Sequence, residues 1–153
     1  MIFCRLLNIS IIKIIYQLKE NRLKKEEKIV KKSDSLAKSN SREVSLVSFI
    51  KKSLIEGKAD NLVEVSVDEN FSEFDHLLIA SGSSNRQVVS LAEKILEEVK
   101  KSYKINGKIE GKENADWILL DFYSVIVHIF RPEVREYYQI EKIWKSSLVK
   151  KSN

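Results

Sequence analysis

Four ionisable side chains of the types used in acid–base catalysis lie near the C-terminal end of the chain: Asp116, Asp121, His128 and Arg135. An enzyme would also need a nucleophile or an electrophilic group at a fixed place beside them. No Ser or Cys nucleophile can be placed with these residues from their spacing. An isolated imidazole in a strand is, moreover, more often a hydrogen-bonded structural group than a catalyst. We therefore expect a protein that is not an enzyme and uses no cofactor.

The stretch Ser81-Gly82-Ser83-Ser84 is the most suggestive chemical motif, because it joins an apolar run to an amphipathic run. Backbone amides at a helix N-terminus bind anions, and nucleotidyltransferases place a Gly-Ser pair at this kind of junction. Those enzymes also hold magnesium with paired carboxylates on a neighbouring strand. Here Asp116 and Asp121 are five residues apart, and this odd spacing sends them to opposite faces of a strand. The pattern favours a capped helix over phosphate binding.

The residue types also argue against metal and disulfide chemistry. The chain has one cysteine, Cys4, and two histidines, His76 and His128. These are too few for a zinc-type cluster of Cys and His ligands. A single cysteine gives no disulfide framework and is compatible with a reducing compartment. We expect a cytoplasmic protein without a metal site.

Residues 116–144 form the densest apolar and aromatic stretch, and they predict two strands followed by a helix. Runs rich in β-branched and aromatic residues at 117–122 and 125–130 are separated only by Tyr123-Ser124, as in a tight hairpin. A two-residue loop pairs Phe122 with Val125, and the other pairs follow by counting back. One face of the hairpin is then wholly apolar and belongs to the core: Ile118, Leu120, Phe122, Val125, Val127 and Ile129.

The opposite face of this hairpin mixes large apolar groups with a carboxylate and an imidazole. Its cross-strand pairs are Trp117/Phe130, Leu119/His128 and Asp121/Ile126. This mixture is typical neither of a core nor of a solvent face. It is typical of a surface that binds a partner.

The rest of the chain predicts helices and short strands around this hairpin. A helix is expected over 40–57 with Val44, Val47, Ile50 and Leu54 on one face. Strands are expected at 62–67, 76–80 and 108–110, with a loop over 68–75. A capping box of Ser84 and Gln87 begins a helix with a continuous apolar stripe. A last helix begins at Pro132, and its inward positions are Val134, Tyr137, Ile140/Glu141 and Trp144.

This order of elements predicts the α/β (α+β) class, a single domain in which helices pack on a mixed sheet. We place the domain at residues 43–145, after a basic extension and linker at 1–42 that we expect to be disordered, and before a basic tail at 146–153. Residues 1–45 hold 11 Lys/Arg against 5 Asp/Glu, whereas residues 46–141 sum to −5. A mildly acidic domain suits a basic protein partner better than a nucleic acid.

The first 18 residues are rich in Ile and Leu but are interrupted by Arg5, Asn8, Ser10 and Lys13. They therefore cannot form an uninterrupted membrane span of about 20 apolar residues, and no membrane partner is expected. A transit peptide, a membrane-surface segment and a start site set too early are alternatives to a loosely ordered extension.

Six short motifs follow one another in order over about residues 44–145. They are Lys58-Ala59-Asp60, Ala80-Ser-Gly-Ser-Ser-Asn-Arg-Gln87, Glu110-Gly111, Ala115-Asp-Trp-Ile-Leu-Leu-Asp121, Val125-Ile-Val-His128 and Arg135-Glu-Tyr-Tyr-Gln-Ile-Glu-Lys-Ile-Trp144. Together they resemble the motifs of the ribosomal silencing factor (Iojap-like) family. The resemblance implies a nucleotidyltransferase-like fold without the catalytic carboxylates. It implies a translation repressor that binds the large ribosomal subunit at ribosomal protein fourteen. Binding there would block joining of the small subunit when nutrients are short.

The resemblance and the residues together point to one partner-binding site: Trp117, Leu119, Asp121, His128, Arg135, Tyr138 and Glu141. Trp117 is expected to be the aromatic anchor, and Asp121 to pair with a Lys or Arg of the basic partner. No small-molecule substrate is expected, and a homodimer of the free protein is left open. The alternatives are a nucleotidyltransferase-like enzyme and an RNA-binding ribosome assembly factor.

The chain departs from the family pattern in the hairpin turn. The family usually has Gly where this chain has Tyr123, and Thr-Gly where it has Ser81-Gly82. A type I′ turn needs positive φ at its central residues, which a tyrosine rarely adopts. Tyr123 therefore suggests a different or longer loop.

Overall fold

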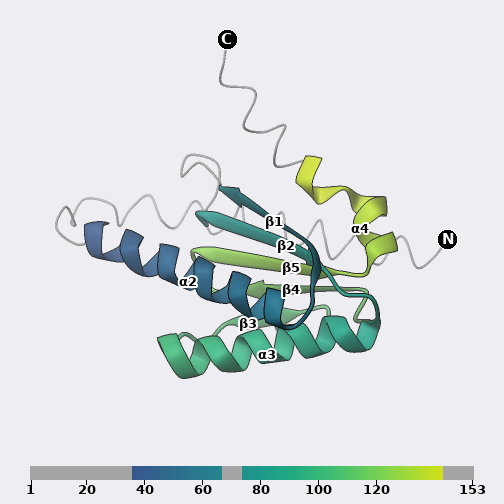
Figure 1. Cartoon of the computed structure of the whole chain (residues 1–153), viewed down its shortest axis with the longest axis horizontal. Coiled ribbons are helices and arrows are strands. Elements are labelled where there is room, and N and C mark those ends of the chain that lie inside the picture. The colour runs from purple at the N-terminus through teal and green to yellow at the C-terminus, as the bar shows by residue number, and fades with distance from the viewer. Residues whose placement is uncertain (1–35, 67–73, 143–153) are drawn as a thin grey trace, which may run out of the picture.

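The computed structural model describes residues 36–66 and 74–142, with side chains from residue 44 onward in the first helix. The described part contains three α-helices, the last of them short, and five β-strands in a single α/β arrangement, shown in Figure 1. The helices and strands are α2 (Leu36–Glu56), β1 (Asp60–Ser66), β2 (His76–Ser81), α3 (Asn85–Tyr103), β3 (Lys108–Glu110), β4 (Trp117–Asp121), β5 (Val125–Phe130) and α4 (Pro132–Tyr138).

The strands form one mixed sheet in the order β1-β2-β5-β4-β3. β2 and β5 pair in parallel at its centre, with His76 opposite Val125 and Ser81 opposite Phe130. The other neighbours pair antiparallel. The sequence predicted a mixed sheet with packed helices, and the structure confirms it.

Helices α2 and α3 lie side by side on one face of the sheet (Figure 1). Their apolar stripes and the inward face of the β4–β5 hairpin form the first core, as predicted. In α3 the buried positions are Val88, Leu91, Ala92, Ile95 and Val99. The helix begins because the Ser84 side chain accepts a hydrogen bond from the Gln87 backbone N–H at 3.2 Å.

The other face of the sheet carries a second core, which α4 and the residues after it close at one end. Buried apolar side chains from four strands and from the segments before β2 and after α4 form it: Val65, Phe74, Leu77, Ile79, Leu119, Ile126, Phe130 and Ile140. Trp117, Val134 and Tyr138 are partly buried against this cluster. The sequence predicted that this hairpin face is neither a core nor a solvent face. In the structure most of it is buried in the second core.

The β4–β5 hairpin has the register that a two-residue loop requires. Trp117 pairs with Phe130, Leu119 with His128 and Asp121 with Ile126. The next pair continues the register, because the Phe122 N–H donates to the carbonyl of Val125 at 3.0 Å. The expectation of a longer loop was wrong, because the loop stays at two residues. A turn other than type I′ is confirmed, because Tyr123 adopts φ 70° whereas Ser124 does not have a positive φ.

Two other details of the prediction are corrected. Helix α2 begins at Leu36, four residues before the predicted start at Asn40, and Val44 is 59% exposed rather than inward-facing. In α4, Tyr137 is 68% exposed, whereas its neighbour Tyr138 packs on the second core. Trp144 and the predicted loop residues 68–73 lie outside the described residues.

Within residues 36–66 and 74–142, no helix has the length and apolar character needed to cross a membrane.

Candidate functional site

The four groups that sequence analysis considered as an acid–base set serve separate structural contacts. Asp116 accepts a hydrogen bond from Asn85 Nδ2 at 3.1 Å, and its carboxylate lies 3.8 Å from the Arg131 guanidinium. Asp121 lies at the opposite end of β4. Arg135 binds Ser81 and Glu141 from α4. In the described part of the chain, no three His, Cys, Asp or Glu side chains are grouped as metal ligands.

The Ser81–Ser84 junction is occupied by contacts of the chain itself. Ser84 caps α3, but the Gln87 side chain does not complete the predicted capping box. Its Oε1 accepts instead from the backbone N–H and the hydroxyl of Ser83, at 2.7 and 2.8 Å. Its Nε2 donates to the carbonyls of Gly57 and Lys58 at 3.2 and 3.0 Å, which ties α3 to the end of α2. The predicted helix cap is present, with a different partner for Gln87.

Trp117 is the centre of the candidate docking face, which comprises Trp117, Leu119, Asp121 and His128 of the hairpin. Its indole stacks on Phe130 with ring centroids 4.8 Å apart and lies 5.6 Å from the ring of Tyr138. Its Nε1 donates a hydrogen bond to Nδ1 of His128 at 2.9 Å. The side chain is only partly buried, so the indole is held in one orientation while part of it reaches solvent.

His128 supports Trp117 from inside the second core. The residue is 5% exposed, and burial lowers the pKa of its imidazole to about 3. The ring is therefore neutral at physiological pH, with Nδ1 as the acceptor for the indole and the proton on Nε2. A neutral buried imidazole in this position orients the aromatic anchor and offers no charge to a partner.

Asp121 lies at the hairpin end of the same face and has a local role that the sequence did not reveal. Its Oδ1 accepts a hydrogen bond from the Tyr123 N–H at 2.8 Å. The Ser124 N–H in turn donates to the Phe122 carbonyl at 3.0 Å, in the three-residue pattern of a γ-turn. The carboxylate is only partly buried. It therefore closes the turn and still presents negative charge at the edge of the docking face.

The predicted residues of the last helix fix α4 against the sheet. Arg135 donates to the Ser81 hydroxyl at 2.9 Å through Nη1 and to Glu141 at 2.8 Å through Nε. Its side chain is 11% exposed and that of Glu141 is 20% exposed. This ion pair links the end of β2 to the segment after α4, and it holds Tyr138 over Trp117.

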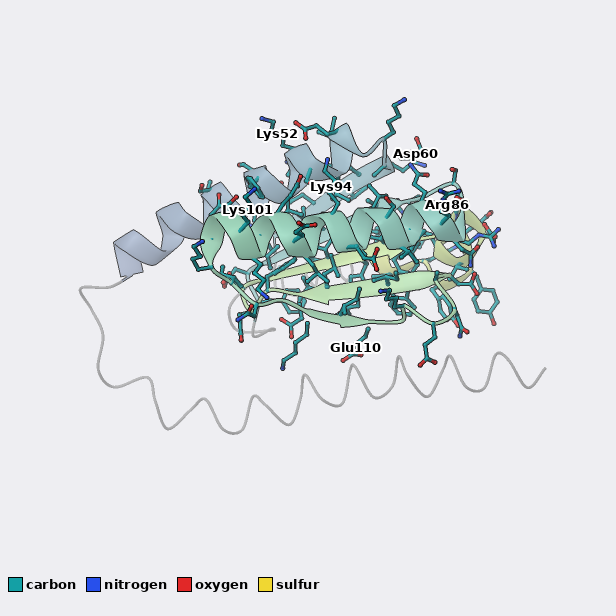
Figure 2. All side chains as sticks on the ribbon, turned by 90° about the horizontal axis from the view of Figure 1, so that it is seen from below. Lys52, Asp60, Arg86, Lys94, Lys101 and Glu110 are labelled. Atoms are coloured by element: carbon teal, nitrogen blue, oxygen red, sulfur yellow. The ribbon has the colours of Figure 1, made fainter. Side chains whose placement is uncertain are left out.

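The structure adds two charged residues that sequence analysis missed. Lys108 is the cross-strand partner of Asp121, and Glu110 that of Leu119. Residues paired directly across a sheet share a face, so Lys108 and Glu110 extend the docking face to the β3 edge. Figure 2 shows Glu110 on the side of the sheet away from α3. The alternation Lys-Ile-Glu indicated a half-buried strand, but only the register assigns its faces.

The members of the predicted site therefore differ in what they can offer a partner. Leu119 is 8% exposed and His128 5%, so both mainly support the surface from below. Trp117, Asp121 and Tyr138 are partly exposed, so these three side chains can reach a partner. Arg135 and Glu141 position α4 beside them.

A known protein family matches this chain over nearly all of the residues that the structure describes. A family model for the ribosomal silencing factor during starvation matches residues 38–153. A ribosomal silencing factor of Haemophilus influenzae is 38% identical over 102 residues, which cover 66% of this chain and 99% of that protein. One from Zymomonas mobilis is 38% identical over 99 residues, covering 65% of this chain and 74% of that protein.

Solved structures show the same fold. A crystal structure of a Chromobacterium violaceum protein superimposes with a TM-score of 0.63 at 31% sequence identity, covering 66% of this chain and 84% of that one. A Bacillus halodurans protein gives a TM-score of 0.58 at 32% identity, covering 65% and 93%. The chain therefore belongs to the ribosomal silencing factor family, and a ribosome-associated silencing role in translation goes with that membership.

Proposed function

We propose that this chain binds the large ribosomal subunit through ribosomal protein fourteen and blocks joining of the small subunit. The contact surface is the exposed part of Trp117 with Asp121 and Tyr138, and Leu119, His128, Arg135 and Glu141 hold it in shape. The protein acts by occupying a surface and not by catalysis. Slower translation under nutrient limitation is the expected result.

The observation that carries this proposal is the partly exposed Trp117 indole in a preorganised setting. Its orientation is fixed by the hydrogen bond to His128 and by stacking on Phe130 and Tyr138. An aromatic side chain that is already ordered loses little conformational entropy on binding, and tryptophan is enriched among the residues that dominate binding energy. The cost of ordering the anchor is therefore met during folding.

Charge supports the choice of a basic protein as the partner. Residues 46–141 sum to −5, and Asp121 and Glu110 place carboxylates on or beside the docking face. Opposite charge across an interface steers association and fixes its register. Lys108 lies among these acids at the β3 edge, so the field of the docking face is not uniformly negative.

The test is sedimentation of the full chain with purified ribosomal particles. The protein should sediment with isolated large subunits and be absent from small subunits and from joined ribosomes. When added before mixing, it should lower the fraction of subunits that join. Equal recovery with joined ribosomes would exclude the blocking mechanism, and binding that survives the removal of ribosomal protein fourteen would exclude that partner.

A further inference from the structure

We propose that Lys100, Lys101, Lys104 and Lys108, which we call the basic end, bind backbone phosphates of ribosomal RNA beside the docked ribosomal protein. This proposal rests on the proposed function, because it assigns a second contact on the same large subunit. The basic end is a local exception to the acidity of residues 46–141. It would add an electrostatic contact that is independent of sequence.

The lysines whose side chains are described differ in their pairing: some form ion pairs within the described chain, whereas Lys58, Lys142 and the lysines of the basic end do not. Lys51 forms an ion pair with Glu64, and Lys52 forms one with Glu56. Lys94 lies within ion-pair distance of Glu56 and Glu98, and Lys112 pairs with Glu93. None of the lysines of the basic end forms an ion pair within the described chain, and all of them are exposed. Glu97 lies one turn before Lys101 on α3, yet the two are not paired. Four unpaired, exposed lysines therefore come from the end of α3 and the start of β3.

The chain path gathers these lysines at one end of the molecule. Lys100 and Lys101 lie in the last turn of α3, and Lys104 is its left-handed C-cap, with its N–H bonded to the Lys100 carbonyl at 3.1 Å. Figure 2 shows Lys101 at this end of α3, with Arg86 at the other end. A tight connection then leads to Lys108, the first residue of β3.

Gly107 makes this connection tight. A Cβ there would lie 2.3 Å from the Phe122 ring and 2.9 Å from Leu96, so any side chain would push the loop away from the core. The close approach keeps the connection between α3 and β3 against the core, and Lys108 follows directly after it as the first residue of β3. The last turn of a helix favours basic side chains through its dipole, which accounts for Lys100 and Lys101. The dipole does not account for Lys108, because that residue lies in a strand.

The basic end adjoins the docking face directly. Lys108 is the cross-strand neighbour of Asp121, so one side chain belongs to both surfaces. If a partner protein binds over Trp117 and Asp121, the part of the ribosomal subunit that borders this partner faces the end of α3. On a ribosomal subunit, a protein surface is bordered by RNA, whose phosphates are the complement of unpaired ammonium groups.

The contact should read phosphates and not bases. The nearest aromatic ring on α3 is that of Tyr103, which packs edge-on against Phe49 with ring centroids 5.3 Å apart. Its hydroxyl lies 2.8 Å from the Ser45 hydroxyl. This ring is engaged within the fold and provides no stacking platform for an unpaired base. Flexible lysines act on phosphates as point charges, so binding would depend strongly on salt.

The experiment compares two variants of the full chain that lose the same amount of positive charge. The test variant carries Lys100→Gln, Lys101→Gln, Lys104→Asn and Lys108→Gln. The matched control carries Lys52→Gln, Lys58→Asn, Lys94→Gln and Lys112→Gln. Asn is used at Lys104 and Lys58 because both residues adopt φ 58°, a conformation that Asn tolerates better than Gln. Both variants keep the basic N- and C-terminal stretches.

Binding to isolated large subunits is measured over a range of salt concentrations. The test variant should lose at least about tenfold in affinity at low salt, and its slope of log K against log salt should fall by about 0.7–0.9 for each lysine that contacts a phosphate. The control variant should retain the wild-type slope. Because Lys108 also borders the docking face, the protein contact is tested with a variant that carries only Lys100→Gln, Lys101→Gln and Lys104→Asn, and its binding to isolated ribosomal protein fourteen should be unchanged.

An unchanged slope in the test variant, or an equal loss in the control, would overturn this proposal. A loss of binding to isolated ribosomal protein fourteen would assign the basic end to the protein contact, and would overturn it as well. The two proposals fail separately. If Trp117→Ala leaves large-subunit binding intact while the lysine variant weakens it, the docking face is wrong and the RNA contact stands. If the wild-type chain does not bind large subunits, both are excluded.

Discussion

The indole Nε1 of Trp117 donates a hydrogen bond to Nδ1 of His128, 2.9 Å away, across the β4–β5 hairpin. The two residues are diagonal neighbours, because Trp117 pairs with Phe130 and His128 with Leu119. The bond requires an unprotonated Nδ1, and burial of His128 keeps it so. The same contact thus fixes the orientation of the proposed docking anchor, Trp117, and makes the stability of the hairpin sensitive to protonation of His128.

The stability of the fold should fall as the pH drops below about 6.5. Burial lowers the pKa of His128 from 6.5 to about 3 in the folded chain, so between these values the unfolded state binds more protons at this residue. The contribution of His128 is fully present above the unfolded pKa and is lost as the pH falls towards the folded one. Between pH 7.5 and 5.5 the free energy of unfolding should decrease by about 1.4 kcal/mol from this residue, measured by urea titration.

The control for this pH dependence is a variant that lacks the buried imidazole. His128→Gln should lower stability at pH 7.5 and also remove most of the slope between pH 7.5 and 5.5. A slope that persists in this variant would show that a group other than His128 carries the pH dependence.

Trp117→Ala should weaken large-subunit binding by at least about 2 kcal/mol, roughly thirtyfold in affinity, because it removes the preorganised anchor. Since the indole is only partly buried, Trp117→Ala should lower the free energy of unfolding by less than the about 3–5 kcal/mol that truncation of a fully buried aromatic residue costs. Affinity is measured on subunits, and stability in urea.

Two variants calibrate this result. Leu120 is fully buried in the first core. Leu120→Ala should therefore lower the free energy of unfolding by about 2–5 kcal/mol, while the folded fraction of this variant binds large subunits normally. Tyr137→Ala removes an aromatic ring that is 68% exposed on α4 and should change neither property much. If Tyr137→Ala costs more affinity than Trp117→Ala, the partner contacts the outer side of α4.

Asp121 can be tested for charge and for turn closure separately. Asp121→Asn keeps an oxygen that can accept the Tyr123 N–H, so stability should stay near that of the wild type while association with a basic partner becomes slower and less dependent on salt. Asp121→Lys should also lose about 0.5–1.5 kcal/mol of stability with the turn hydrogen bond and should bind more weakly still. Association rates at two salt concentrations distinguish these effects, and identical rates for all three proteins would remove Asp121 from the interface.

Tyr123→Gly should stabilise the hairpin by up to about 1 kcal/mol. Tyr123 holds φ 70°, a region that costs a residue with a Cβ about 1–2 kcal/mol, and the greater entropy of glycine in the unfolded chain offsets part of the gain. Tyr123→Ala removes the exposed ring but keeps the Cβ, and it should show no such gain. Urea titration of both variants is the measurement, and equal stabilities would mean that the turn stores no backbone strain.

The sequence by itself determined the elements whose signals are local. The strand period and the two-residue gap at Tyr123-Ser124 predicted every pair of the β4–β5 hairpin, because short loops leave the register no freedom. The Ser84 cap and the apolar stripe of α3 were likewise predictable from neighbouring residues. The motifs that resemble the ribosomal silencing factor family were also identified from the sequence alone.

Tertiary structure alone decided how the hairpin face is used. The parallel pairing of β2 with β5 joins strands that are far apart in the sequence, and no local period specifies such a partner. That pairing and the packing of α4 enclose Leu119 and His128, while part of Trp117 stays exposed. The register of β3 against β4 likewise places Lys108 beside Asp121. Burial depends on what packs against a face, so residue types in the hairpin could mark the candidate site but could not distinguish its exposed members from its buried ones.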